Sequence, residues 1–65
     1  MIAPKENYLA HMAELRDAGR QLMHLFAESG RLSEDSKEQH KIRRCYLEAE
    51  LYVLQIEDVI EKMES

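Results

Sequence analysis

Residues Cys45–Ile60, CYLEAELYVLQIEDVI, decide the fold, because they form the densest apolar run in the chain and contain neither glycine nor proline. Two stripes of apolar residues recur there at the three- and four-residue spacing of an α-helix. The first stripe suits a partner helix in the same chain, whereas the second has no evident partner. The first comprises Ile42, Tyr46, Ala49, Val53, Ile56, Ile60 and Met63, and the second comprises Leu47, Leu51 and Leu54.

The length of 65 residues allows one small domain with a marginal core. With 45% hydrophobic and 34% charged residues, two glycines and one proline, the composition is helical and not that of a disordered chain. The single cysteine, Cys45, cannot form an internal disulfide. Because no metal cluster is evident, we expect association, with a second copy or with another protein, to complete the core.

The expected location is the cytoplasm. The opening residues, MIAPKENY, lack the basic segment and apolar run of a secretory signal. No run of about 18 apolar residues is present, so we expect no membrane insertion. A lone cysteine inside a helical pattern is consistent with a reducing compartment.

The expected fold class is all-α, an antiparallel two-helix hairpin completed by oligomerisation into a four-helix bundle or a heterocomplex. The first helix is predicted over residues 5–29, the turn over 30–33 and the second helix over 34–63, as one domain of residues 1–65. Gly30 is predicted to end the first helix in the left-handed conformation. Ser33 is predicted to cap the second helix.

The register of the hairpin follows from a turn centred near residue 32. Gly19 then faces Tyr46 and Leu15 faces Ala49, so that a small residue meets a large one in both pairs. The predicted hairpin core consists of Tyr8, Met12, Leu15, Gly19, Leu22, Tyr46, Ala49, Val53 and Ile56.

Catalytic and metal chemistry are not expected. His11 with Glu14, and His24 with Glu28, have spacings that could supply metal ligands, but no histidine lies in the core stretch of the second helix. Cys45 is interpreted as a packed structural residue. A two-helix hairpin offers no catalytic pocket, so we expect no enzyme activity and no cofactor.

A nucleic-acid-binding alternative follows from basic residues near the turn. A net charge of −4 and an acidic second half argue against nucleic acid as the main partner. Dimeric hairpins that bind RNA, of the plasmid Rop type, resemble this chain in length and architecture only. A small regulatory inhibitor protein is a further alternative. The basic residues concerned are Arg20, His24, Lys41, Arg43 and Arg44.

The second stripe is the predicted partner-binding surface. Three leucines in line with a charged rim are typical of an interface for a helical partner or for a second copy. We therefore expect a non-enzymatic helical adaptor or co-chaperone. The predicted partner-binding residues are Leu47, Leu51, Leu54, Arg44 and Asp58.

The chain also resembles the small E-type co-chaperones of type III secretion needle subunits. The residues that carry the resemblance are the turn AESGRLSED, residues 27–35, and the run 39–60 with its LEAELYVLQI segment. Proteins of that family are helical hairpins that join a second helical chaperone to keep the needle subunit soluble in the cytoplasm. The resemblance implies that the surface around Tyr46, Leu47, Leu51 and Leu54 contacts the partner chaperone.

Overall fold

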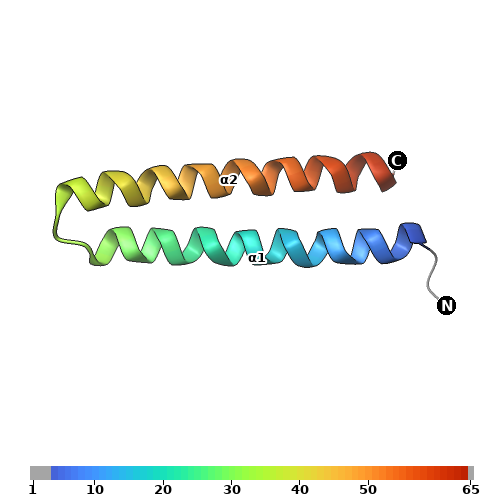
Figure 1. Cartoon of the computed structure of the whole chain (residues 1–65), viewed down its shortest axis with the longest axis horizontal. Coiled ribbons are helices and arrows are strands. Elements are labelled where there is room, and N and C mark those ends of the chain that lie inside the picture. The colour runs from blue at the N-terminus through green and yellow to red at the C-terminus, as the bar shows by residue number, and fades with distance from the viewer. Residues whose placement is uncertain (1–3, 65) are drawn as a thin grey trace.

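The computed structural model describes residues 4–64, which form two long antiparallel helices (Figure 1). Helix α1 spans Pro4–Leu32 and helix α2 spans Ser36–Glu64, with three residues between them. The start of α1 and the end of α2 lie at the same end of the molecule. Residues 4–64 contain no strand and no further helix, which confirms the predicted all-α hairpin.

Gly30 lies inside α1 and does not end it, so the prediction of a left-handed glycine at this position is wrong. Neither glycine has a positive φ. The backbone N–H of Ser33 donates to the carbonyl of Ser29 at 3.0 Å, so helical hydrogen bonding continues past Gly30. As a result α1 ends three residues later than expected, and α2 begins two residues later.

The N-cap of α2 is Asp35 and not Ser33, which corrects the second prediction for the turn. The backbone N–H of Lys37 donates to Asp35 Oδ1 at 2.9 Å, and that of Gln39 donates to the Asp35 carbonyl at 2.9 Å. These two bonds define an N-cap residue. Ser33 Oγ instead lies 3.3 Å from the Asp35 carbonyl and 3.2 Å from the Glu38 carboxylate, which closes the turn.

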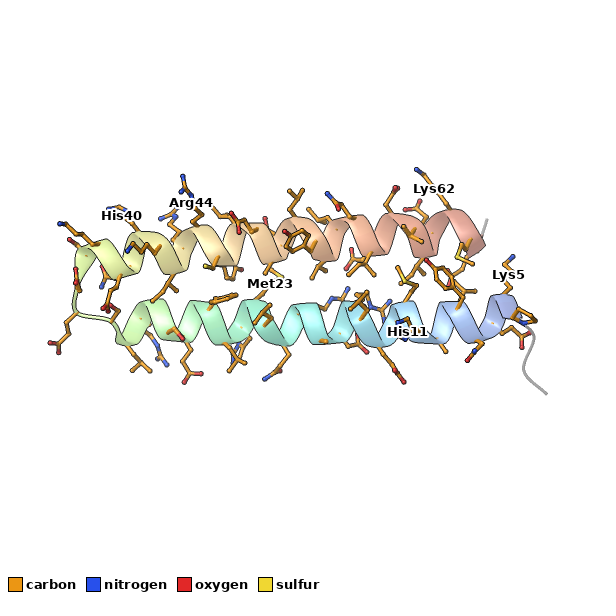
Figure 2. All side chains as sticks on the ribbon, in the orientation of Figure 1. Lys5, His11, Met23, His40, Arg44 and Lys62 are labelled. Carbon is orange, nitrogen blue, oxygen red and sulfur yellow. The ribbon has the colours of Figure 1, made fainter. Side chains whose placement is uncertain are left out.

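The core is a single narrow seam between the two helices. Four described residues are buried, and none has less than 2% of its surface exposed. Figure 2 shows Met23 of α1 pointing into the seam. Of the predicted core, Gly19, Tyr46 and Ile56 are half-buried at its edges. The four buried residues are Met12, Ala49, Val53 and Ile60, of which three belong to the predicted core.

Helix α1 is rotated relative to the prediction, because Tyr8, Leu15 and Leu22 lie outside the seam with 45–47% of their surface exposed. On α1, the predicted core and the observed inner positions share Met12 and Gly19. Arg16 takes an inner position, with its side chain 28% exposed. Its aliphatic stem can cover the seam while the guanidinium reaches the edge. The buried or half-buried positions of α1 belong to Leu9, Met12, Ala13, Arg16, Gly19, Met23, Phe26 and Gly30.

The register also differs from the prediction, since Gly19 faces Val53 and not Tyr46. A Cβ atom placed on Gly19 would lie 2.7 Å from Val53 Cγ2, and one on Gly30 would lie 3.5 Å from Ile42 Cγ2. Both contacts place α2 about two helical turns away from the predicted alignment. The predicted turn was centred too early because Gly30 was taken as a helix end.

Alanine at the two glycines is expected to change stability in opposite directions. At Gly30 the added methyl makes an ordinary contact, so the helix propensity of alanine stabilises the fold by up to about 1 kcal/mol. At Gly19 the methyl clashes with the stiff, buried Val53 side chain, and overpacking costs about 1–3 kcal/mol, which outweighs that gain. Thermal unfolding followed by circular dichroism measures the stability of both variants relative to the unmodified chain.

The double variant Gly19→Ala/Val53→Ala tests whether the Gly19→Ala effect comes from the Val53 contact. Removing the two Val53 methyl groups makes room for the new one, so the double variant should lose less stability than the two single variants combined. Strictly additive losses would contradict the close approach.

Loss of the Asp35 cap is expected to destabilise the hairpin. Asp35→Ala removes the acceptor for the Lys37 N–H and should lower the free energy of unfolding by about 0.5–2 kcal/mol. The matched control is Glu34→Ala, which changes a neighbouring acid in the same turn that caps neither helix. Urea titration measures the free energy of unfolding of both variants. An equal decrease in the two would argue against Asp35 as the cap.

Candidate interaction surfaces

The outer leucine stripe, Leu47, Leu51 and Leu54, lies on the side of α2 that faces away from α1. These side chains are 52%, 53% and 55% exposed. The flanking predicted residues, Arg44 and Asp58, are exposed as well, and Figure 2 shows Arg44 pointing away from α1. All five predicted partner-binding residues are therefore exposed on α2.

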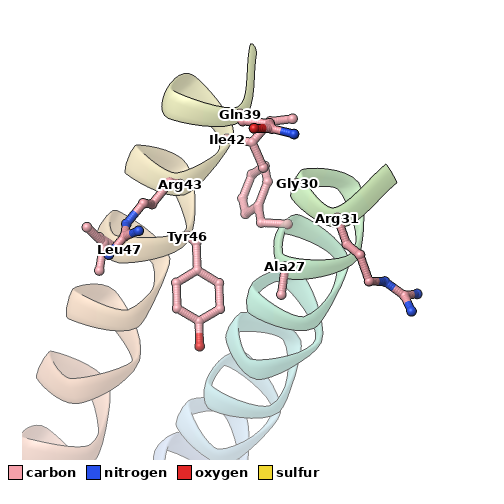
Figure 3. Close-up of a pocket in the computed structure, with 9 residues that line it drawn as sticks. Ala27, Gly30, Arg31, Gln39, Ile42, Arg43, Tyr46 and Leu47 are labelled. Atoms are coloured by element: carbon pink, nitrogen blue, oxygen red, sulfur yellow. The ribbon is translucent and has the colours of Figure 1, made fainter. Parts of the chain in front are cut away.

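A pocket near the turn adjoins one end of this stripe (Figure 3). Leu47 contributes to its wall, Tyr46 and Phe26 supply aromatic surface, and Arg31 and Arg43 stand at its rim. The stripe is thus continuous with a recess that is apolar inside and basic outside. The residues lining the recess are Phe26, Ala27, Gly30, Arg31, Gln39, Ile42, Arg43, Tyr46 and Leu47.

A second apolar surface, absent from the sequence prediction, is a groove along one face of the hairpin. It runs between α1 and α2, and its lining is apolar except for the Gln55 amide and the Tyr52 hydroxyl group. Five of the lining residues belong to the predicted hairpin core, and two of these, Leu15 and Leu22, are exposed. We call this surface the apolar groove. Its lining residues are Met12, Leu15, Ala18, Gly19, Leu22, Tyr52, Gln55, Ile56 and Val59.

The sequence contains a signal for the two apolar faces that form the groove. Tyr8, Leu15 and Leu22 recur every seven residues, which marks a second helix face that overlaps the core stripe. Tyr52 and Val59, also seven residues apart, belong to neither stripe of the second helix. Two faces with heptad spacing on adjacent helices indicate a shared surface.

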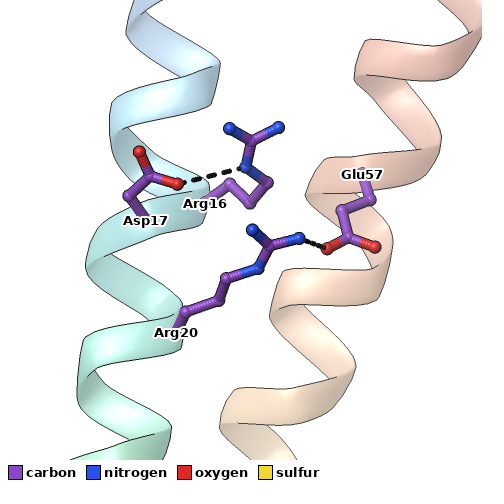
Figure 4. Close-up of polar contacts among 4 residues, drawn as sticks. All are labelled: Arg16, Asp17, Arg20 and Glu57. Atoms are coloured by element: carbon purple, nitrogen blue, oxygen red, sulfur yellow. Dashed lines mark hydrogen bonds and ion pairs between the residues drawn. The ribbon is translucent and has the colours of Figure 1, made fainter.

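On the opposite face of the hairpin, an ion pair joins the two helices. Arg20 donates from Nη2 to Glu57 Oε1 at 2.6 Å and so joins α1 to α2 (Figure 4). Beside it, Arg16 Nε contacts Asp17 Oδ1 at 3.2 Å. Successive helical residues are about 100° apart, so Ala18 and Arg20 lie on opposite sides of the inward-facing Gly19. The apolar groove and this ion pair therefore occupy different faces.

The basic character of the turn end is reduced by internal pairing. Arg20 is paired with Glu57, and Arg31 lies 3.6 Å from Glu28. His40, Lys41 and Arg44 line a separate shallow depression on α2 with Cys45, which is half-buried. Of the cations predicted to contact phosphates, Arg20 is therefore engaged by a carboxylate of α2.

The three histidines are exposed and lie far apart along the hairpin, at positions 11, 24 and 40. Among residues 4–64, no three histidine, cysteine or acidic side chains gather as a metal site would require. Neither α1 nor α2 has a segment apolar and long enough to cross a bilayer. What the described surface offers chemically is apolar contact with charged edges.

Comparisons of the chain with protein-family models, with curated proteins and with solved structures find no match.

The Arg20–Glu57 pair is expected to add little to stability. Both side chains are more than one-third exposed, and pairs of this kind contribute about 0.2–1 kcal/mol in double-mutant cycles. The cycle combines Arg20→Gln, Glu57→Gln and both together, measured by chemical unfolding. We expect the coupling to fall further in high salt. A coupling that exceeds this range and resists salt would contradict a solvent-exposed pair.

Proposed function

We propose that this protein is a non-enzymatic helical adaptor or co-chaperone that binds a helical partner protein through the outer leucine stripe of α2. The observation that carries the proposal is the alignment of three leucines, each more than half exposed, on the side that α1 cannot cover. Single exposed leucines are ordinary on protein surfaces, whereas a contiguous apolar strip with a charged rim is typical of an interface.

The chemistry of the stripe defines the partner segment as an amphipathic helix. Leucines at positions 47, 51 and 54 present a row that an apolar helix face matches at the same spacing. Arg43 and Arg44 flank one end of the row, and Asp58 and Glu61 flank the other. A partner helix with acidic residues at one end and basic residues at the other would fit, and the charges would set its direction.

Two further observations favour a protein partner over nucleic acid. Two of the cations near the turn, Arg20 and Arg31, lie against carboxylates. The chain as a whole carries a net charge of −4, which repels a phosphate backbone. The resemblance of residues 39–60 to the E-type co-chaperones supports the co-chaperone form of this activity, with a helical chaperone as partner in the cytoplasm.

The variant Leu51→Glu tests the proposal. It places a charge in the middle of the stripe, away from the hairpin seam, so helix content should be unchanged. Loss of one buried leucine should weaken partner binding by about 10- to 100-fold. The measurement is capture of the partner from extracts of the native host, its identification by mass spectrometry, and titration with the purified partner.

The matched control is Leu32→Glu, which makes the same change at a leucine that is 71% exposed at the end of α1, outside the stripe. It should bind the partner like the unmodified chain. If Leu51→Glu also retains full affinity, the stripe is not the binding surface and the proposal is wrong.

A further inference from the structure

The apolar groove lies on a face that the outer leucine stripe does not use. On α2 the groove is lined by Tyr52, Ile56 and Val59, whereas the stripe occupies positions on the far side of that helix. Residues 51 and 52 are neighbours in sequence but lie about 100° apart around the helix. A molecule seated in the groove would therefore leave Leu51 accessible.

The groove is bordered by large exposed side chains. Tyr52 is 61% exposed, and Leu25, next to the groove on α1, is 48% exposed. The floor is low in the middle, where Ala18 and Gly19 lie between Leu15 and Leu22. Large residues on either side of a small floor form the ridges and hollow into which side chains of another helix layer can pack.

The dimensions of the hairpin match those of half a two-layer domain. Its Cα atoms extend 50 × 20 × 11 Å, which is one layer of two helices. Stable domains bury their apolar faces between two layers. The groove lies near the middle of the 50 × 20 Å face, between residues 12–22 of α1 and 52–59 of α2. A second hairpin laid along this face would cover an area of the same order as the roughly 800 Å² that each partner buries in a standard interface. One further layer of the same size is sufficient to cover it.

The uncharged lining of the groove also favours a second copy of the same surface as its binding partner. No described residue that lines it is charged, so it supplies no charge pattern to select a different partner. Two copies of an uncharged apolar face do not repel each other, and a two-fold axis lets the same patch serve both molecules. The opposite face lacks this property because the Arg20–Glu57 pair spans it.

We propose that a second copy of this chain docks on the apolar groove, so that two hairpins pair face to face in a four-helix bundle. The outer leucine stripe of each copy then stays on the outside of the bundle. The self-association surface is therefore distinct from the surface proposed above for the partner protein, and either can fail without the other.

The test is sedimentation equilibrium of the full chain from micromolar to submillimolar concentration. The unmodified chain should be dimeric. Leu22→Glu places a charge in the groove, and because each substitution occurs twice in the dimer, the dissociation constant should rise by at least about 100-fold. Circular dichroism checks that the helices persist.

A second groove variant guards against a general loss of folding. Ala18→Glu removes no large side chain and introduces a good helix former, and it should also give a monomer. Leu51→Glu and Leu32→Glu, at leucines outside the groove, should stay dimeric. The proposal is overturned by a monomeric unmodified chain, by a dimer that survives Leu22→Glu and Ala18→Glu, or by equal disruption from the variants outside the groove.

Discussion

The close approach of α1 to α2 at Gly19 and Val53 is the constraint on which the rest of the structure depends. A Cβ atom at Gly19 would meet Val53 Cγ2 at 2.7 Å, so only glycine permits this spacing without a shift. The contact fixes the register of the two helices. It also fixes the rotation of α1, because Met12, Gly19 and Phe26 must share the inner ridge with Leu9, Arg16 and Met23. Tyr8, Leu15 and Leu22 are thereby turned to the surface.

A single seam between two helices cannot bury all the large apolar side chains of this sequence. Only four described residues are buried, while seven leucines and two tyrosines remain exposed. The reason is geometric, because a helix that contacts one neighbour hides only one side, and both helices here are apolar on more than one side. The apolar surface that remains exposed forms two areas, the apolar groove between the helices and the outer leucine stripe of α2. These two surfaces have different shapes and different charged surroundings, so they suit different occupants.

Much of the fold could be predicted from the sequence, and the errors have identifiable causes. The hairpin and the inner side of α2 follow from helical spacing, and Ala49 and Val53 are buried as predicted. The prediction failed for α1 because its two apolar stripes overlap, and spacing alone does not show which one faces inward. The face of α1 that turns inward includes Arg16, a charged residue that interrupts its apolar pattern. Gly30 resembled a helix stop, yet it lies inside α1, where an added Cβ atom would make only an ordinary contact with Ile42.

The outer stripe could be predicted completely from the sequence, whereas the sequence indicates only the two apolar faces that form the groove and not how they adjoin. The stripe belongs to one helix, so its spacing can be read from positions 47, 51 and 54 alone. The groove requires Leu15 and Leu22 of α1 to lie beside Tyr52 and Val59 of α2, which depends on the register and rotation of the pair. A shift of two turns along α2 changes every such neighbour. Surfaces made by two helices therefore become visible only once the contact at Gly19 is known, and this contact determines where the hairpin can receive a second layer.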